Sequence, residues 1–178
     1  KNASSLTCLK KINVLRSHMK ENGLEAYVVS DLNEVSYLTN LRGFDLPYTP
    51  VFYGFLFVSL DKAYLFINKN RYKEDIEGID TIFEYDEFSS FLKNCPYSKV
   101  GVDVNSINFE LSSILKERAV PVSSLVENDK AIKGQVEIDN TINAQIEDGV
   151  ALTKFIINFK EEVKNGTDEF SLSKLLHS

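Results

Sequence analysis

The chain has 178 residues, 43% of them hydrophobic and 26% charged, which is enough for one ordinary domain or for one domain and part of another. Its 20 basic and 26 acidic residues give a formal net charge of −6, so we expect no nucleic-acid partner, because nucleic-acid binding needs a basic face. No window approaches the roughly 18 apolar residues of a membrane span, and two cysteines cannot form a disulfide framework, which excludes a membrane-spanning protein and a small secreted scaffold.

The first predicted elements are a helix, a strand and a second helix. Residues 5–22 have apolar side chains at three- and four-residue steps, and Gly23 is a typical helix stop. The apolar run 26–29 predicts a short buried strand. Asp31 then favours the start of another helix, because its carboxylate can accept from free amide groups, and Glu34 is placed to complete a capping box.

The middle of the chain is predicted to alternate strands with helices. Two apolar runs, 52–60 and 63–68, flank Asp61-Lys62 and predict a β-hairpin. Further strands are predicted at 81–85, 99–105 and 120–123, and helices at 86–94 and 108–118. The strand at 99–105 is indicated by valines that alternate with other residues. The order predicts an α/β fold with a mixed β-sheet flanked by helices, since a hairpin introduces antiparallel pairing.

After residue 124 the pattern becomes purely helical. Apolar residues recur at helical spacing between 130 and 163, and Asn165-Gly166 predicts the end of that helix. Another helix is predicted over 167–178, because a capping oxygen and acidic residues stand at its start. These two helices have a wide apolar face and little to cover it, so the second unit looks cut off.

This change of pattern predicts a domain boundary near residues 125–135. The first domain is predicted over residues 1–128 as the α/β domain. The second is predicted over residues 129–178 as a linker followed by helices.

The residues alone give no catalytic or metal-ligating set. The acidic residues are scattered, and none forms a tight ligand pattern with a histidine. Cys8 and Cys95 have no histidine base placed by the sequence, which favours structural roles. Gly43 and Gly101 are isolated, so a nucleotide-binding α/β domain with a glycine-rich phosphate loop is disfavoured.

The predicted loop over residues 40–52 is rich in Tyr, Phe and Pro around Arg42-Gly43. An arginine fork there could hold the carboxylate of a peptide. Alternatively, Arg42 pairs with a nearby acid such as Asp45, and the aromatic residues belong to the core. The residues leave both interpretations open.

Several strings, in order over most of residues 10–178, resemble one known family. They are Asp31 to Asp45, Pro50 to Tyr53, Val100 to Asp103, Lys130 to Lys133 and Asp148 to Leu152. They resemble the middle domain, the linker and the first catalytic-domain helix of the three-domain, eukaryotic-type Xaa-Pro aminopeptidases.

The resemblance implies a creatinase/prolidase N-terminal-like α/β domain over residues 1–128, and the opening helices of a truncated pita-bread catalytic domain over residues 129–178. It further implies a cytoplasmic, homodimeric parent enzyme that removes the N-terminal residue from peptides with proline in second position. Two manganese ions would activate a bridging water in that parent. Their ligands in the family follow the stretch that is matched here. The resemblance therefore implies a fragment with no catalytic residue, no metal ligand and no cofactor, whose role is architectural, in dimerisation and active-site access.

One residue departs from the family pattern. The family often has a histidine near the substrate where this chain has Gln145, and a glutamine can hydrogen-bond but cannot shuttle a proton at neutral pH. Carried over from the family, Arg42 and Gln145 are the positions expected nearest to the substrate. The alternative is a peptide- or histone-binding module of a pita-bread relative that has lost its metal ions.

Overall fold

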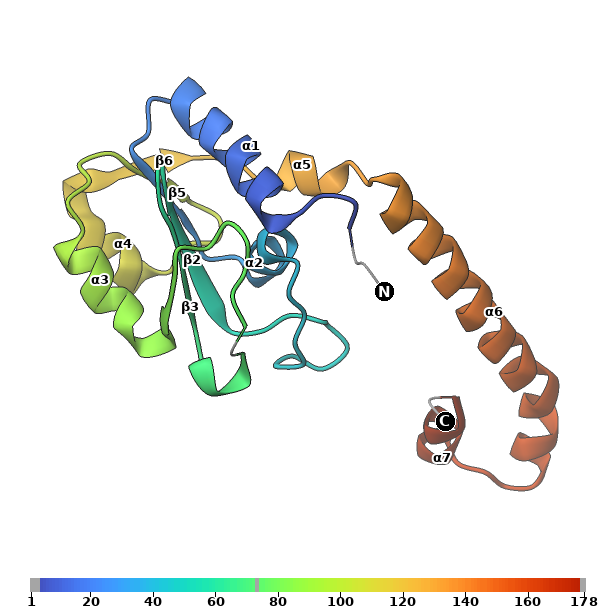
Figure 1. Cartoon of the computed structure of the whole chain (residues 1–178). Helices are drawn as coiled ribbons and strands as arrows, with labels where there is room; N and C mark the ends of the chain where they lie inside the picture. The colour runs from blue at the N-terminus through green and yellow to red at the C-terminus, as the bar shows by residue number, and fades with distance from the viewer. Residues whose placement is uncertain (1–3, 73, 177–178) are drawn as a thin grey trace. The chain divides into compact units, whose positions relative to one another are not determined.

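The computed structural model describes residues 4–72 and 74–176, and the chain divides into two compact units (Figure 1). The α/β unit comprises Leu6–Ile132. The helical unit comprises Lys133–Ser178 together with Lys1–Ser5. The predicted α/β fold is confirmed in the first of these units.

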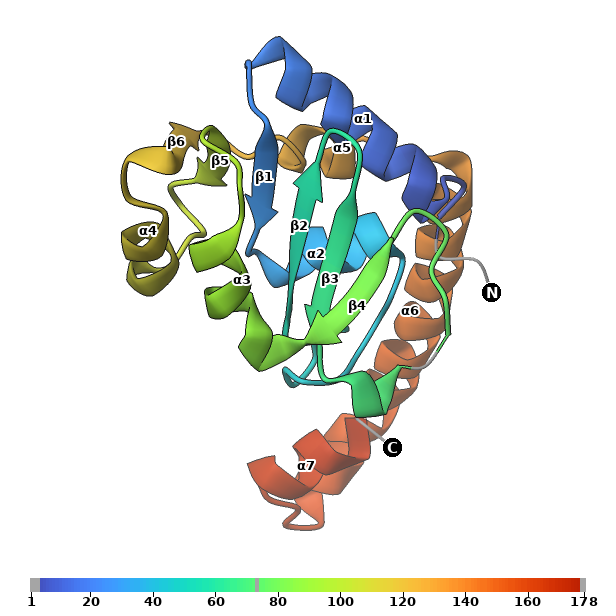
Figure 2. The ribbon, with the colours of Figure 1, turned by 60° about the vertical axis from the view of Figure 1, so that its left-hand side comes forward.

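A six-stranded mixed sheet forms the centre of the α/β unit (Figure 2). Its strand order is β4-β3-β2-β1-β5-β6. The strands are β1 (Ala26–Val29), β2 (Gly54–Ser59), β3 (Ala63–Ile67), β4 (Thr81–Glu84), β5 (Val100–Asp103) and β6 (Ala119–Val122). The pairs β1–β2 and β2–β3 are antiparallel, whereas β1–β5, β5–β6 and β3–β4 are parallel. The predicted hairpin thus supplies part of the antiparallel pairing that makes the sheet mixed.

Helices cover both faces of this sheet (Figure 1). The helices are α1 (Cys8–Glu21), α2 (Leu32–Thr39), α3 (Phe88–Asn94), α4 (Phe109–Leu115) and α5 (Glu127–Ala131). Three short 3₁₀ turns are η1 (Lys69–Arg71), η2 (Tyr85–Glu87) and η3 (Lys116–Arg118). One core lies under α1 and α2, and the other under α3 and α4. Alternate strand residues enter opposite cores, as expected for a sheet covered on both sides.

Strand β5 is buried on both faces, in keeping with a sheet flanked by helices. All four of its residues are buried, because both faces of the sheet are covered. Gly101 is the residue that allows the closest packing there, since a Cβ atom at this position would lie 2.5 Å from Leu24 Cδ1 and 2.8 Å from Tyr27 Cδ2. The isolated Gly101 is therefore explained by core packing.

Helix α2 begins as predicted, with the Asp31 carboxylate accepting a hydrogen bond from the Glu34 backbone N–H at 3.0 Å. The second half of the capping box is replaced by a longer-range contact. The Glu34 carboxylate is buried and accepts a hydrogen bond from the Ser124 hydroxyl. This contact ties α2 to the segment that leads into α5.

The helical unit contains α6 (Gln135–Lys164) and α7 (Glu169–Leu176). The predicted helix over 130–163 is two helices, since α5 ends at Ala131 and α6 begins after Gly134. Gly166, with a φ of 82°, follows α6 as predicted, and the Asp168 carboxylate accepts from the Ser171 backbone N–H at 2.7 Å. The predicted last helix extends to residues 177–178, which lie outside the described residues.

Candidate functional site

The loop that follows α2 begins at a fixed point. Asn40 has the left-handed conformation, with a φ of 59°, that commonly ends a helix. The buried Lys11 of α1 donates through Nζ to the Tyr37 carbonyl and to Asn40 Oδ1, each at 2.7 Å, and lies 3.8 Å from the centroid of the Tyr37 ring. A charged donor with two acceptors and an aromatic face holds the start of the loop against α1.

Backbone hydrogen bonds shape the rest of the loop into a narrow turn. Leu46 and Thr49 form an isolated bridge, and the Asp45 backbone N–H donates to the Val51 carbonyl at 3.2 Å. The Asp45 carboxylate accepts from the Tyr53 backbone N–H at 2.8 Å. The turn is therefore tied back to the residues that lead into β2.

The interpretation of the loop aromatics as core residues is only partly right. Phe44 and Tyr48 are each 93% exposed, and Tyr48 also has a positive φ of 61°. Phe52, by contrast, is only 9% exposed. Because a positive φ is rare for a bulky residue, the surrounding hydrogen bonds must hold this turn in place.

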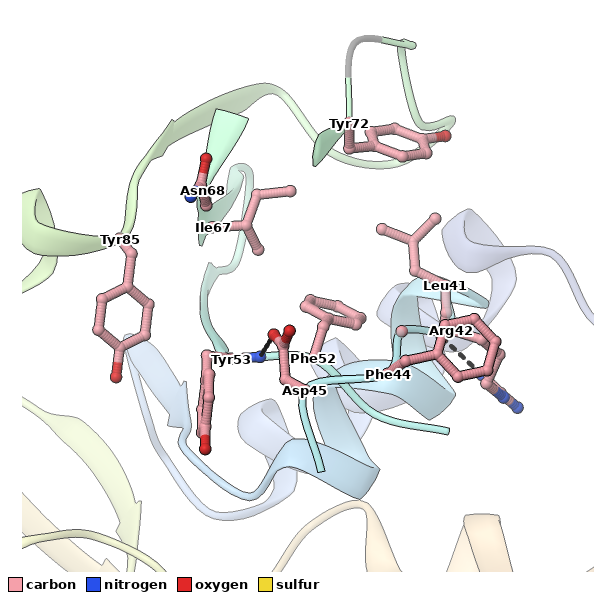
Figure 3. Close-up of a pocket in the computed structure, with 11 residues that line it drawn as sticks. Leu41, Arg42, Phe44, Asp45, Phe52, Tyr53, Ile67, Asn68, Tyr72 and Tyr85 are labelled. Atoms are coloured by element: carbon pink, nitrogen blue, oxygen red, sulfur yellow. Dashed lines mark hydrogen bonds between the residues drawn. The ribbon is translucent and has the colours of Figure 1, made fainter. Parts of the chain in front are cut away.

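Arg42 lies on the same loop, and its guanidinium is committed to the main chain. Its Nη1 donates to the Ser36 carbonyl at 2.7 Å and to the Leu41 carbonyl at 2.8 Å. The Ser36 carbonyl belongs to the last turn of α2, where carbonyls lack a partner within the helix and where a cation is favourable. In the structure, Arg42 thus stabilises the end of α2, and Figure 3 shows its guanidinium pointing away from the neighbouring cavity.

A cavity of about 860 Å³ lies beside this loop, within the α/β unit (Figure 3). It is lined by Leu41, Arg42, Gly43, Phe44, Asp45, Phe52, Tyr53, Ile67, Asn68, Tyr72 and Tyr85. The lining thus comes from the loop, the lead into β2, the end of β3, the two residues that flank η1 and the first residue of η2. Five of the eleven side chains are aromatic, which is typical of a small-molecule or peptide site.

Two glycines make the floor of the cavity possible. Phe52 and Ile67 are almost fully buried and form that floor. A Cβ at Gly43 would lie 2.7 Å from Phe52 Cβ, and one at Gly54 would lie 2.9 Å from Ile67 Cγ2 and 3.0 Å from Phe52 Cε2. Phe52 therefore needs a residue without a side chain both next to its Cβ, at Gly43, and next to its ring, at Gly54.

Tyr53 and Tyr85 stand on one side of the cavity, opposite Leu41 and Phe44 (Figure 3). The Tyr85 ring stacks on Phe55 with their centroids 5.1 Å apart, which fixes its orientation. Burial, and then the nearby Asp86, raise the pKa of Tyr85, so its hydroxyl group stays protonated at neutral pH.

The two residues that the family resemblance singles out lie in different units. Arg42 belongs to the α/β unit and is exposed, and Gln145 lies exposed on α6 in the helical unit. The role of each near a substrate remains a prediction. The sequence analysis did not predict the aromatic cavity beside Arg42. The adjacent aromatic residues Phe52-Tyr53 at the end of the loop are the one local signal of it, and no local pattern indicates Tyr72 or Tyr85.

Within residues 4–72 and 74–176, no group of three or more His, Cys, Asp or Glu side chains is placed to hold a metal ion. Burial raises the pKa of the Cys8 thiol to about 11, and Cys95 is also buried. A neutral, shielded thiol is a poor nucleophile. No helix in the described part of the chain is both long and apolar enough to cross a membrane.

Comparison with known proteins gives a consistent set of relatives. The sequence model of the creatinase/prolidase N-terminal domain family matches residues 2–137. The chain is 32% identical over 161 residues to an uncharacterized peptidase of Schizosaccharomyces pombe, with 88% of this chain and 27% of the relative covered. It is 30% identical over 192 residues to the Xaa-Pro aminopeptidase ApepP of Drosophila melanogaster, with 98% and 30% covered.

The same similarity appears in solved structures. A cytosolic X-prolyl aminopeptidase of Caenorhabditis elegans with a di-nuclear active site superposes with a TM-score of 0.88 at 27% identity, covering 98% of this chain and 31% of that one. An Xaa-Pro dipeptidase of Bacillus anthracis, at 23% identity and a TM-score of 0.68 over 94% of this chain and 49% of that one, shares the fold. The chain thus spans less than a third of the length of the aminopeptidase relatives named here.

Proposed function

Because the chain belongs to the creatinase/prolidase N-terminal domain family, we propose that it is part of an Xaa-Pro aminopeptidase, which releases the N-terminal residue from peptides with proline in second position. The observation that carries the proposal is the similarity over 98% of the chain to an aminopeptidase of this specificity in Drosophila. The superposition on the Caenorhabditis elegans X-prolyl aminopeptidase supports it independently of sequence identity.

The role of this part of the enzyme is architectural. Residues 1–128 act as the creatinase/prolidase N-terminal-like domain, and residues 129–178 as the linker and opening helices of a pita-bread catalytic domain. The apolar side chains that α6 exposes support this assignment, because a further domain would cover them. They include Ile142, Ile146, Val150, Ile156 and Val163.

The chemistry belongs to a part of the parent enzyme outside this chain. Two manganese ions in the catalytic domain would activate a water molecule for attack on the peptide bond. Among residues 4–72 and 74–176, no group of three or more His, Cys, Asp or Glu side chains is placed to hold such ions. The parent is proposed to be cytoplasmic and homodimeric, with this domain shaping dimerisation and access to the active site.

Arg42 and Gln145 are the residues proposed to lie nearest to the substrate. Gln145 can hydrogen-bond to a peptide but cannot transfer a proton at neutral pH. The replacement of the family histidine by Gln145 also favours a second candidate function, a peptide- or histone-binding module of a relative without metal ions. The two candidates differ in whether the parent cleaves peptides.

The decisive experiment compares the full-length parent with the 178-residue chain. The parent, freed of metal with a chelator and then supplied with Mn²⁺, is expected to cleave Xaa-Pro peptides and to leave matched Xaa-Ala peptides intact. The 178-residue chain under the same conditions is expected to cleave neither. A manganese-loaded parent that binds peptides without cleaving them would support the second candidate instead.

A further inference from the structure

The cavity beside the loop after α2 has a lining that matches one kind of ligand. We propose that it binds a proline-rich segment of the peptide substrate in the extended polyproline II conformation. This inference rests on the proposed function, and it adds a second contact region for the substrate, built entirely within the α/β unit.

The aromatic side chains provide the surface that such a segment needs. Proline-rich segments dock on aromatic-lined grooves, and their preformed helix loses little conformational entropy on binding. Here Tyr53 and Tyr85 stand on one side of the cavity, and Phe52 forms the floor (Figure 3). Stacking of Tyr85 on Phe55, and of Phe55 on Phe88 with centroids 4.4 Å apart, fixes the orientation of Tyr85 before any ligand arrives.

The hydroxyl and amide groups of the lining match a chain without amide hydrogens, and the Asp45 carboxylate in the same lining already accepts from the Tyr53 backbone N–H. Proline has no backbone N–H, so a proline-rich segment presents carbonyl acceptors with few donors. Tyr53, Tyr72 and Tyr85 each carry a hydroxyl group that can donate to such carbonyls. The Asn68 side chain accepts from the Asn70 backbone N–H through Oδ1 at 3.0 Å, which leaves its amide group to act as a donor.

The cavity is large and fixed enough for this role. Its volume of about 860 Å³ lies within the range of about 300–1,000 Å³ that is usual for ligand sites. Gly43 and Gly54 have no side chain where one would displace the floor residue Phe52. The site is thus a preformed one, which lowers the cost of ordering on binding.

The test uses the 178-residue chain and a proline hexapeptide blocked at both ends, which has no free amino terminus and is therefore no aminopeptidase substrate. Binding is measured by calorimetry and by ¹H–¹⁵N NMR shifts. The proline peptide is expected to bind at least about tenfold more tightly than a blocked alanine hexapeptide. Equal affinities, or shifts confined to residues outside the cavity, would overturn the inference.

Variants distinguish binding in the cavity from non-specific binding to exposed aromatic rings. Tyr53→Ala is expected to weaken binding about tenfold, as for a central aromatic contact, and Tyr85→Phe about threefold through loss of one hydroxyl donor. Phe109→Ala removes another highly exposed ring, remote in sequence from the lining, and is expected to leave binding unchanged. If Phe109→Ala and Tyr53→Ala weaken binding equally, the cavity is not the site.

This binding test can fail or succeed independently of the proposed aminopeptidase function, because a peptide blocked at both ends reports binding without cleavage. If the parent cleaves Xaa-Pro peptides but the 178-residue chain does not bind the proline hexapeptide, the proposed function holds and the proposed cavity site is wrong. If the 178-residue chain binds the hexapeptide but the parent cleaves no peptide, the cavity site holds and the proposed aminopeptidase function is wrong.

Discussion

Replacement of Gly101 by alanine tests the packing at the centre of the sheet. The new Cβ atom would lie 2.5 Å from Leu24 Cδ1 and 2.8 Å from Tyr27 Cδ2, both shorter than any normal carbon contact. Leu24 is 3% exposed and Tyr27 is fully buried, so neither can move into solvent. Overpacking a well-packed core costs about 1–3 kcal/mol, and Gly101→Ala is expected to lower the free energy of unfolding of the α/β unit by that amount.

Gly149 provides a matched control for the same chemical change. It lies in the interior of α6, and a Cβ there would meet no atom within 4 Å. Alanine is more favourable than glycine in a helix interior by about 1 kcal/mol. Gly149→Ala is therefore expected to stabilise α6, so the two substitutions have opposite signs.

Tyrosine fluorescence during urea unfolding separates the two effects. The chain has 8 tyrosines and no tryptophan, and every tyrosine lies between residues 27 and 97, within the α/β unit. With a urea dependence of about 1–3 kcal/mol per molar, Gly101→Ala should lower the tyrosine-monitored midpoint by about 1 M, and Gly149→Ala should leave it unchanged. A Gly101→Ala midpoint equal to that of the wild type would show that Leu24 and Tyr27 can move aside, and would refute the packing argument.

Three further measurements follow from individual contacts. Burial raises the pKa of Glu34 in the folded state, so the wild type loses stability as the pH rises and the carboxyl group ionises. The variant Glu34→Gln keeps an acceptor for Ser124 and does not ionise, so its stability relative to the wild type should be greater at about pH 7 than at about pH 4. An equal difference in the free energy of unfolding at the two pH values, measured by urea unfolding, would contradict this. Arg42→Ala leaves two carbonyls without the guanidinium and is expected to cost about 1 kcal/mol in the same tyrosine-monitored unfolding, where an unchanged midpoint would show that water replaces these bonds. Since burial raises the pKa of Cys8 to about 11, the Cys95→Ser variant should react with a thiol reagent at about pH 8 only on unfolding, and rapid stoichiometric labelling of the native chain would show that Cys8 is accessible.

The order of elements was accessible from the sequence because its signals are local. Apolar periodicity, the Asp31 cap and the apolar runs on either side of Asp61-Lys62 each act over a few residues, and the corresponding helices and strands are present in the structure. Which helices cover each face of the sheet was not accessible in this way. That α1 and α2 lie on one face and α3 and α4 on the other is a property of the assembled sheet.

The candidate site was less accessible because its parts come together only on folding. The loop around Arg42 was recognised from its composition, but the partners of Arg42 are backbone carbonyls near the end of α2, which no residue type encodes. The cavity joins Phe52 to Tyr72 and Tyr85, which belong to different segments. Side-chain identity alone cannot place such residues at one site, since the pairing of β3 with both β2 and β4 brings the ends of these segments together.

The segment before α5 shows how the α/β unit ends. The Ser124 hydroxyl donates to Glu34, the Leu125 backbone N–H donates to the Tyr27 hydroxyl at 3.3 Å, and Val126 is 1% exposed. His18 Nε2 lies 3.0 Å from Asp129 Oδ2, which adds a contact between α1 and α5. These long-range contacts explain why the chain stays in the α/β unit as far as Ile132.

The α/β unit and the helical unit are each stabilised in a different way. The α/β unit has two buried cores, whereas α6 has no buried residue and α7 buries only Leu172. Most of the stability of a helix in a protein comes from packing of its apolar face rather than from its intrinsic propensity. A 30-residue helix with exposed isoleucines therefore needs a surface to cover it. A catalytic domain of the kind proposed above would cover this apolar face.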